Sequence, residues 1–171
     1  AMGSPLGPVL ADIFLGFMEH YCLRSAIQNS CLSYHRFVDD CFASFNSIED
    51  ATSFLDILNS VHNSLTFTLE VEDEGSLAFL DVNVSRDSSG NAITSVHRKP
   101  TWSGLYLHFY SFVPISYKRG LVRTLFDRAR KICSPNFLNE EFRIITDALL
   151  SNGYPKKFIE KYSLNTCNIL L

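Results

Sequence analysis

Residues 33–45, SYHRFVDDCFASF, hold two short runs of aromatic and apolar side chains on either side of the adjacent carboxylates Asp39 and Asp40. Both runs have the composition of β-strands, and aspartate tolerates the backbone geometry of a tight turn. The pattern therefore predicts a β-hairpin with the two aspartates at its tip. A metal site is the second interpretation, because neighbouring carboxylates repel each other unless cations neutralise them. The pair alone does not decide between a turn and a metal site.

The segments around this hairpin alternate between helical and strand periodicity. Residues 8–25 and residues from Ser47 to about 64 carry apolar side chains at helical spacing, with Ser47 and Asp50 as an approximate capping box. In the first helix the apolar stripe comprises Leu10, Ile13, Phe14, Phe17 and Tyr21. Residues 66–71, 77–86 and 92–98 have strand character and are separated by turn-rich segments. This order predicts an α+β fold in which helices back an antiparallel sheet.

From about residue 100 the pattern becomes helical and basic. Helices are expected at residues 117–132, 139–151 and 156–162, and the NGYP turn at 152–155 separates the last two. In the first of them Leu121, Val122, Leu125 and Phe126 are expected in a core, and Lys118, Arg119, Arg123, Arg130 and Lys131 in solvent. We therefore expect two parts, residues 1–99 with the sheet and residues 100–171 as a small all-helical part.

Charge is distributed unevenly between the two parts. Residues 1–95 contain three Lys or Arg against thirteen Asp or Glu, a net charge of −10, whereas residues 96–171 contain twelve against five, a net charge of +7. Such a division suggests a front part that holds cations and a back part that holds a polyanion. The alternative is that the two parts attract each other across an internal interface.

Composition excludes several other classes of protein. The chain is 46% hydrophobic and 19% charged, which is typical of a folded domain and not of a disordered one. No uninterrupted apolar run has the length of a membrane span, and the N-terminus lacks the basic start of a signal peptide, so we expect a soluble intracellular protein without membrane contact. The five cysteines form no CxxC pair, which argues against a zinc knuckle or a disulfide framework.

Basic and aromatic residues are interleaved between His97 and Lys131. Lysine and arginine bind phosphates without reading sequence, and aromatic rings can stack on sugars and bases. The candidate nucleic-acid-binding residues are Arg98, Lys99, Lys118, Arg119 and Arg123. The alternative is that the aromatic residues belong to the core, which we expect for Tyr106, Phe109 and Phe112.

Several motifs occur in an order that resembles a known family. MGSPLGPVLADIFL (residues 2–15) is similar to the loop and helix beneath the incoming nucleotide of reverse transcriptases, and RFVDD (36–40) to their Asp-Asp hairpin. LAFLDVNVSR resembles the strands that lead to the primer grip, and VHRKPTWSGLYLHF with SFVPISYKRGLVRTLFDRARKIC resembles the start of the thumb. The chain resembles most closely the reverse transcriptases of Penelope-like retroelements. The resemblance implies a palm-type sheet over residues 1–99 and a helical, helix-turn-helix-like thumb over residues 100–171.

The resemblance also implies a reaction and its residues. Such an enzyme is an RNA-directed DNA polymerase, a nucleotidyltransferase that uses two Mg²⁺ ions to join a deoxynucleoside triphosphate to the 3′-hydroxyl of a DNA primer on an RNA template. Asp39 would be the direct metal ligand and Asp40 the accessory one, which makes both catalytic. Gly3, Ser4, Pro5 and Phe37 would lie at the nucleotide. A retrotransposon enzyme of this kind implies a nuclear location.

The chain also departs from the family pattern. Only Ala1 and Met2 precede Gly3, so the fingers and a further metal-binding aspartate of the first palm strand are missing. Met2 stands where the family often has glutamine, and no nuclease domain follows. We therefore expect a fragment that is inactive alone and that could require the missing N-terminal part of the polymerase as a partner.

Two alternatives come from different classes. The first is a non-enzymatic nucleic-acid-binding module of helix-turn-helix type, formed by the last three helices around the SNGYP turn. Loss of binding when Lys156 and Lys157 are replaced, but not Arg98 or Lys118, would favour this module over a thumb. The second alternative is a decayed copy without function.

Overall fold

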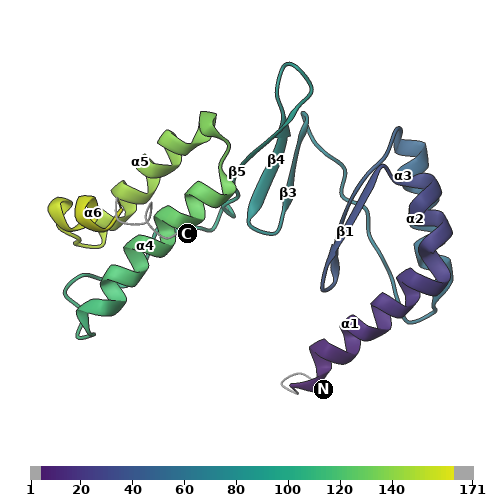
Figure 1. Cartoon of the computed structure of the whole chain (residues 1–171), viewed down its shortest axis with the longest axis horizontal. Coiled ribbons are helices and arrows are strands. Elements are labelled where there is room, and N and C mark those ends of the chain that lie inside the picture. Colours follow the sequence, from purple (N-terminus) through teal and green to yellow (C-terminus); the bar gives the residue numbers. More distant parts are fainter. Residues whose placement is uncertain (1–4, 164–171) are drawn as a thin grey trace, which may run out of the picture. The chain divides into compact units, whose positions relative to one another are not determined.

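The computed structural model describes residues 5–163 of the chain, and its ribbon is drawn in Figure 1. The fold is mixed α+β, as predicted, with two small antiparallel sheets. The chain divides into two compact units, Ala1–Val71 and Glu72–Leu171. The predicted boundary at 99/100 therefore falls inside the second unit.

Unit 1 consists of a long helix, a hairpin and a second helix (Figure 1). The long helix is continuous but contains one π-helical turn, and the hairpin sheet has the strand order β1-β2. The elements are α1 (Leu6–Met18), η1 (Glu19–Leu23), α2 (Arg24–Ser30), β1 (Ser33–Phe37), β2 (Asp40–Ser44) and α3 (Ile48–Val61). Ser47 caps α3 as predicted, because its Oγ accepts a hydrogen bond of 3.1 Å from the N–H of Asp50.

The core of unit 1 lies between the second half of the long helix, α3 and one face of the hairpin. Leu23, Phe54 and Leu58 are its buried centre, and Tyr34 and Phe67 pack against them. The apolar stripe of the first helix, which helical spacing predicted, lies outside this core. Its exposed fractions run from 38% for Phe14 to 69% for Tyr21, and the remaining members lie between these values. The described part of the chain thus leaves an apolar face of α1 uncovered.

The segment that contains α1 also bears on the expectation of no membrane contact. By length and composition the helix Leu6–Ser30 is sufficient to cross a membrane, since its best 18-residue window has a mean hydropathy of 1.2 and is only 11% buried. Within this helix, however, Asp12 and Glu19 form ion pairs with Arg36 of β1. Charged side chains are costly in hydrocarbon, and here they attach the helix to the hairpin. The helix therefore forms one layer of unit 1.

One predicted strand of unit 1 is irregular in the structure. Residues 66–71 were expected to be extended and paired, but they join no sheet. The side chain of Asn59 binds both backbone groups of Phe67, accepting from its N–H at 2.7 Å and donating to its carbonyl at 3.1 Å. A side chain of α3 thus satisfies the groups that a neighbouring strand would otherwise satisfy.

Unit 2 is a three-stranded meander followed by three helices (Figure 1). Its elements are β3 (Ser76–Phe79), β4 (Val82–Arg86), β5 (Ala92–Val96), α4 (Ile115–Ile132), α5 (Pro135–Ser151) and α6 (Lys156–Ser163). The three helices were predicted, with starts at 117, 139 and 156. Residues 77–86, expected as one strand, are two strands joined by a two-residue turn, because Phe79 pairs with Val82 and leaves Leu80 and Asp81 between them.

Strand β5 is attached to the junction of α4 and α5 through Thr94. Its N–H donates to Ser134 Oγ at 2.9 Å, its hydroxyl donates to the carbonyl of Ile132 at 2.5 Å, and its carbonyl accepts from the N–H of Ser134 at 2.8 Å. Arg98, just after β5, forms a bidentate ion pair with the buried Glu141 of α5. These contacts explain why the meander and the helices form one unit.

The three helices enclose the larger core of the protein. Val122, Ala129 and Leu149 have no measurable exposure, and Ile145, Tyr154 and Ile159 are each 2% exposed. Tyr106 and Phe109 pack against this core, as predicted. Phe112, also expected there, is fully exposed.

Candidate nucleic-acid interface

Asp39 and Asp40 lie at the tip of the β1–β2 hairpin, as the sequence predicts. Phe37 pairs with Asp40, so the turn contains only Val38 and Asp39, and both aspartates are exposed. Val38 has a φ of +57°, a left-handed conformation that β-branched residues rarely adopt. Phe37, predicted at the nucleotide, is 59% exposed beside the tip.

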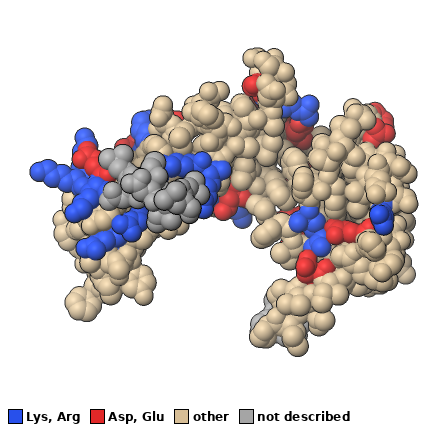
Figure 2. Space-filling model, in the orientation of Figure 1, with Lys and Arg blue, Asp and Glu red and all other residues tan. Residues whose placement is uncertain are grey.

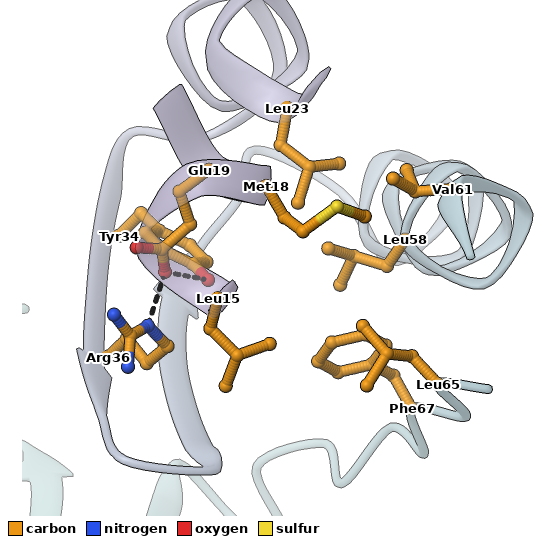
Figure 3. Close-up of a pocket in the computed structure, with 10 residues that line it drawn as sticks. All are labelled: Leu15, Met18, Glu19, Leu23, Tyr34, Arg36, Leu58, Val61, Leu65 and Phe67. Atoms are coloured by element: carbon orange, nitrogen blue, oxygen red, sulfur yellow. Dashed lines mark hydrogen bonds and ion pairs between the residues drawn. The ribbon is translucent and has the colours of Figure 1, made fainter. Parts of the chain in front are cut away.

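The hairpin tip is fixed to the long helix by Arg36. Its Nε donates to Glu19 at 2.7 Å, and its Nη1 donates to Asp12 at 2.8 Å and to the carbonyl of Val38 at 3.0 Å. The hydrogen bonds to the carboxylates of Glu19 and Asp12 raise the pKa of the Arg36 guanidinium. The hydroxyl of Tyr34 donates to the same Glu19 carboxylate at 3.0 Å, as Figure 3 shows. The tip is therefore held in a defined position relative to α1.

A small cavity lies behind this network, but it is not a ligand site. It is lined by apolar side chains of the unit 1 core and, at one end, by Glu19, Tyr34 and Arg36 (Figure 3). Its volume is ≈ 10 Å³, close to the space that one water molecule requires.

The donor set at the tip does not fit a two-metal centre. Asp39 lies in the turn and Asp40 is the first residue of β2, so the tip offers two exposed carboxylates from adjacent residues. Within residues 5–163 no group of three or more His, Cys, Asp or Glu side chains is placed to hold a metal ion. Mg²⁺ requires near-octahedral oxygen coordination and gives up water reluctantly.

A turn like that of Val38 and Asp39 also occurs between β3 and β4, where no catalytic residue was predicted. Leu80 and Asp81 form the two-residue turn between β3 and β4, and Leu80 has a φ of +55°. Asp81 there forms an ion pair of 3.0 Å with Arg128. The geometry of the Val38–Asp39 turn is therefore no evidence of catalysis in itself.

The predicted nucleotide loop lies mostly outside the described part of the chain. Gly3 and Ser4 are outside the described residues, and Pro5 is the exposed N-cap of α1. Their predicted role at the nucleotide stays a prediction.

The α5–α6 connection has the form of a helix-turn-helix. Asn152 ends α5, Gly153 adopts a φ of +81°, and α6 begins after Pro155. The buried Asn152 side chain donates to the carbonyls of Gly104 and Ala148 and accepts from the N–H of Tyr106, at 2.7–3.1 Å. This single side chain fixes the turn to the loop that precedes α4.

Two of the predicted nucleic-acid-binding residues make internal contacts. Arg98 pairs with Glu141, which raises the pKa of its guanidinium, and lies 4.7 Å from the ring centre of Trp102. Lys118, expected in solvent, is 8% exposed, donates to the carbonyl of Ser111 at 2.9 Å and lies 5.4 Å from the ring centre of Phe109. Replacing either side chain would disturb the fold, so binding loss in such variants would not distinguish an interface from a structural role.

The other predicted residues are exposed, and two of them belong to a larger basic cluster. Arg119 and Arg123 of α4 and Lys161 of α6 lie 5.5, 5.5 and 5.6 Å from the ring centre of the buried Tyr162. Lys156 and Lys157 are exposed on the first turn of α6. We name this set the α4–α6 basic surface, and Figure 2 shows blue Lys and Arg atoms gathered over these helices. It comprises Arg119, Arg123, Lys156, Lys157 and Lys161.

Of two further exposed lysines, Lys99 was predicted as a site residue and Lys161 was not. Lys99 is exposed in the loop after β5, and its role stays a prediction. Lys161 and Tyr162 were not among the predicted site residues. The signal was present, because Lys157 and Lys161 are four residues apart and thus share one face of a helix.

Comparison with known families supports the helix-turn-helix interpretation of this region. A model described as animal helix-turn-helix domain matches residues 105–163, which span the loop before α4 and all three helices. Neither the comparison with curated proteins nor that with solved structures gave a match.

Proposed function

We propose that residues 105–163 bind nucleic acid through its phosphates with little dependence on sequence. The observation that carries this proposal is the α4–α6 basic surface, whose five side chains are exposed and have no carboxylate partner within residues 5–163. The match to a helix-turn-helix family supports the same conclusion. Phosphate contacts of this kind supply affinity and position but carry no sequence information.

Three carboxylates of the helical part pair with cations outside this surface. Asp127 pairs with Arg130, Glu140 with Arg143, and Glu141 with Arg98. These pairs leave the net charge unchanged, but they keep three carboxylates from pairing with the α4–α6 basic surface. Glu160 is an exposed carboxylate of α6, and the five cations of the surface outnumber it, so the surface can attract a polyanion.

The composition of α6 favours binding without base reading. In a helix-turn-helix the second helix enters the major groove, where arginine, asparagine and glutamine recognise base edges. The exposed residues at the start of α6 are Lys156, Lys157, Glu160 and Lys161. Lysine is a strong phosphate ligand but a weaker discriminator of bases when it acts as a point charge.

Fluorescence anisotropy with labelled oligonucleotides at several salt concentrations tests this proposal. Lys156→Ala/Lys157→Ala and Arg119→Ala/Arg123→Ala are expected to weaken binding to all sequences equally. Each lost phosphate contact should reduce the magnitude of the slope of log affinity against log salt by about 0.9 for duplex DNA. Arg143→Ala is the matched control, because Arg143 is exposed but paired with Glu140. Equal loss in the control, or a strong preference for one sequence, would contradict the proposal.

As a second candidate, we propose that unit 1 is part of a reverse-transcriptase palm. The supporting observation is the exposed Asp39–Asp40 tip that Arg36 holds against α1. Magnesium, deoxynucleoside triphosphates, an RNA template and a DNA primer are the corresponding ligands. Since the described carboxylates do not fit two metals, such a palm requires further donors.

Paramagnetic broadening by Mn²⁺ tests the metal part of this second candidate. We expect weak binding that broadens backbone NMR signals of residues 37–41 in the native chain and not in Asp39→Asn. Asp81→Asn is the matched control, because Asp81 occupies the same position in the second hairpin turn but pairs with Arg128. Broadening that persists in Asp39→Asn would remove the metal role from this residue.

A further inference from the structure

The loop that precedes α4 exposes large aromatic side chains. Tyr110 is 78% exposed and Phe112 is fully exposed, and Tyr117 at the start of α4 is 66% exposed. Single exposed apolar side chains are common, but several exposed aromatic rings on one short segment mark a candidate interaction site. The sequence predicted Phe112 in the core, so its exposure is a property of the fold that the pattern did not indicate.

The loop backbone is well anchored, so the exposure is not a consequence of missing contacts. The N–H and hydroxyl of Ser111 both donate to the carbonyl of His108, at 3.0 and 2.6 Å. Lys118 donates to the carbonyl of Ser111 at 2.9 Å, which holds the loop to the start of α4. Phe109 packs against the core and donates its N–H to the carbonyl of Asn152 at 2.9 Å. Its ring packs on the rings of Tyr154 and Phe158.

These anchors place the loop at the α5–α6 turn and at the first turns of α4. A Cβ added to Gly153 would meet the His108 ring at 3.2 Å and the Tyr110 ring at 3.4 Å, so Tyr110 lies against the α5–α6 turn. Lys156 and Lys157 follow this turn directly, and Arg119 follows the Lys118 anchor on α4. The loop is therefore fixed where the two basic helices begin.

We propose that Tyr110 and Phe112 stack on unpaired bases of the nucleic acid whose phosphates the α4–α6 basic surface holds. This inference rests on the proposed function and adds the class of ligand, which is single-stranded nucleic acid or a strand with unpaired bases. Only a base outside a continuous duplex stack offers a free face to a ring. The ligand thereby supplies both requirements of this surface, negative charge for the lysines and arginines and flat apolar faces for the aromatic residues.

Phe112→Ala is the sharpest test, because a fully exposed side chain can be removed without loss of internal packing. Anisotropy titrations would use three labelled oligonucleotides of equal length: a single strand, the same strand with abasic sites, and the blunt duplex. We expect Phe112→Ala to weaken binding of the single strand about 5- to 150-fold, the range of one base–aromatic stack. Binding to the abasic strand and the salt slope should stay unchanged. Tyr110→Ala should act in the same direction.

Leu150→Ala is the matched control, because Leu150 is a 43% exposed apolar residue of α5 outside the loop. Circular dichroism melts would verify that all variants are folded, and sedimentation would report their oligomeric state. Equal weakening of the single strand, the abasic strand and the duplex would overturn stacking. Unchanged binding by Phe112→Ala with loss by Lys156→Ala/Lys157→Ala would overturn stacking and leave the phosphate proposal intact. A shift from dimer to monomer in Phe112→Ala would instead identify the loop as a contact between copies and overturn the inference.

Discussion

At the scale of single residues, the two hairpin turns contain apolar residues in a conformation that favours glycine. Val38 and Leu80 each occupy the first turn position with positive φ, and an aspartate follows each. The aspartates allow the turns to be predicted from the sequence, and the first was. The second was missed because the alternation of LAFLDVNVSR continues through Leu80 as if the strand did not end. A positive φ at valine or leucine has no signal in composition, since propensity predicts the opposite.

Replacement of Val38 tests how much this conformation costs. A left-handed β-branched residue is strained by about 1–3 kcal/mol, whereas glycine adopts this conformation freely but loses more entropy on folding. Val38→Gly should therefore raise the free energy of unfolding by about 1 kcal/mol in urea denaturation. Val38→Ala is the control, because alanine keeps most of the backbone strain. A glycine variant less stable than the alanine variant would show that the turn is not strained.

Lys118 shows that helical spacing does not always predict which charged side chains are exposed. Helical spacing placed Lys118 beside Arg119 and Arg123 as a solvent residue, yet it is buried and bonded to Ser111. The spacing was right for the helix, but the loop that covers Lys118 is brought there by Asn152 and Phe109. Contacts of this kind depend on the tertiary path of a loop, which periodicity does not specify.

At the scale of elements, helices were predicted more accurately than strands. The starts of α4 and α5 were placed two and four residues late, since the structure begins them at Ile115 and Pro135. Pro135 is well suited to a first helical turn, but Ser134 before it uses its hydroxyl to bind Thr94 of β5. Residues 66–71 do not form the predicted strand. A strand requires a neighbouring strand to bind its backbone, and the alternation of apolar and polar residues does not show whether one is present. Here the side chain of Asn59 binds that backbone.

Two glycines of the helical part are expected to respond in opposite directions to the same substitution. Gly120 lies within α4 and a Cβ there would meet nothing within 4 Å, so Gly120→Ala should raise the free energy of unfolding by about 0.5–1 kcal/mol. Gly153→Ala should lower it by about 1–3 kcal/mol, because φ is +81° and the Cβ would meet the His108 ring at 3.2 Å.

Urea denaturation of the two variants measures this difference, and each variant is the control for the other. If Gly153→Ala were as stable as the native chain, the α5–α6 turn would not be held in the described conformation, and the position of Tyr110 beside it would lose its support. If Gly120→Ala were destabilised, a contact on the exposed side of α4 would have to be present.

At the scale of the whole molecule, the sequence shows that charge is unevenly distributed, but it does not show that acidic and basic segments belong to the same compact unit. The boundary at 99/100 was predicted from the change to a helical and basic pattern near residue 100. The compact units instead divide at Val71/Glu72, because β5 and Arg98 bind the helices. The acidic meander thus belongs to the same unit as the basic helices, and one of its carboxylates, Asp81, pairs with Arg128 of α4.

The apolar face of α1 is a further property of the whole chain that the sequence indicated only in part. Helical spacing predicted the stripe, and the sequence predicted that helices back the sheet, but within the described residues the stripe is largely exposed. The long helix contacts the hairpin through Asp12 and Glu19 and contributes Leu23 to the core. Leu10, Ile13 and Phe17 lie on the exposed side at 54–62% exposure. The described part of unit 1 consequently has a small core, which predicts lower stability for unit 1 than for unit 2.

The position of the boundary gives the last prediction, which compares two shortened chains. Residues 72–171 keep Thr94 and Arg98 with their partners Ser134 and Glu141, whereas residues 100–171 lose both. In the shorter chain Glu141, whose side chain is 7% exposed, would have no charged partner. Breaking a buried ion pair costs about 3–5 kcal/mol, and the cost is smaller here because removal of residues 72–99 also gives water access to Glu141. Urea denaturation should therefore show a cooperative transition for residues 72–171 and a weaker one, or none, for residues 100–171.

Glu141→Gln in the shorter chain should restore part of the difference, because a neutral amide is less costly to bury. Equal stability of the two chains would place the boundary where the sequence predicted it and would show that the contacts of β5 with the helices contribute little.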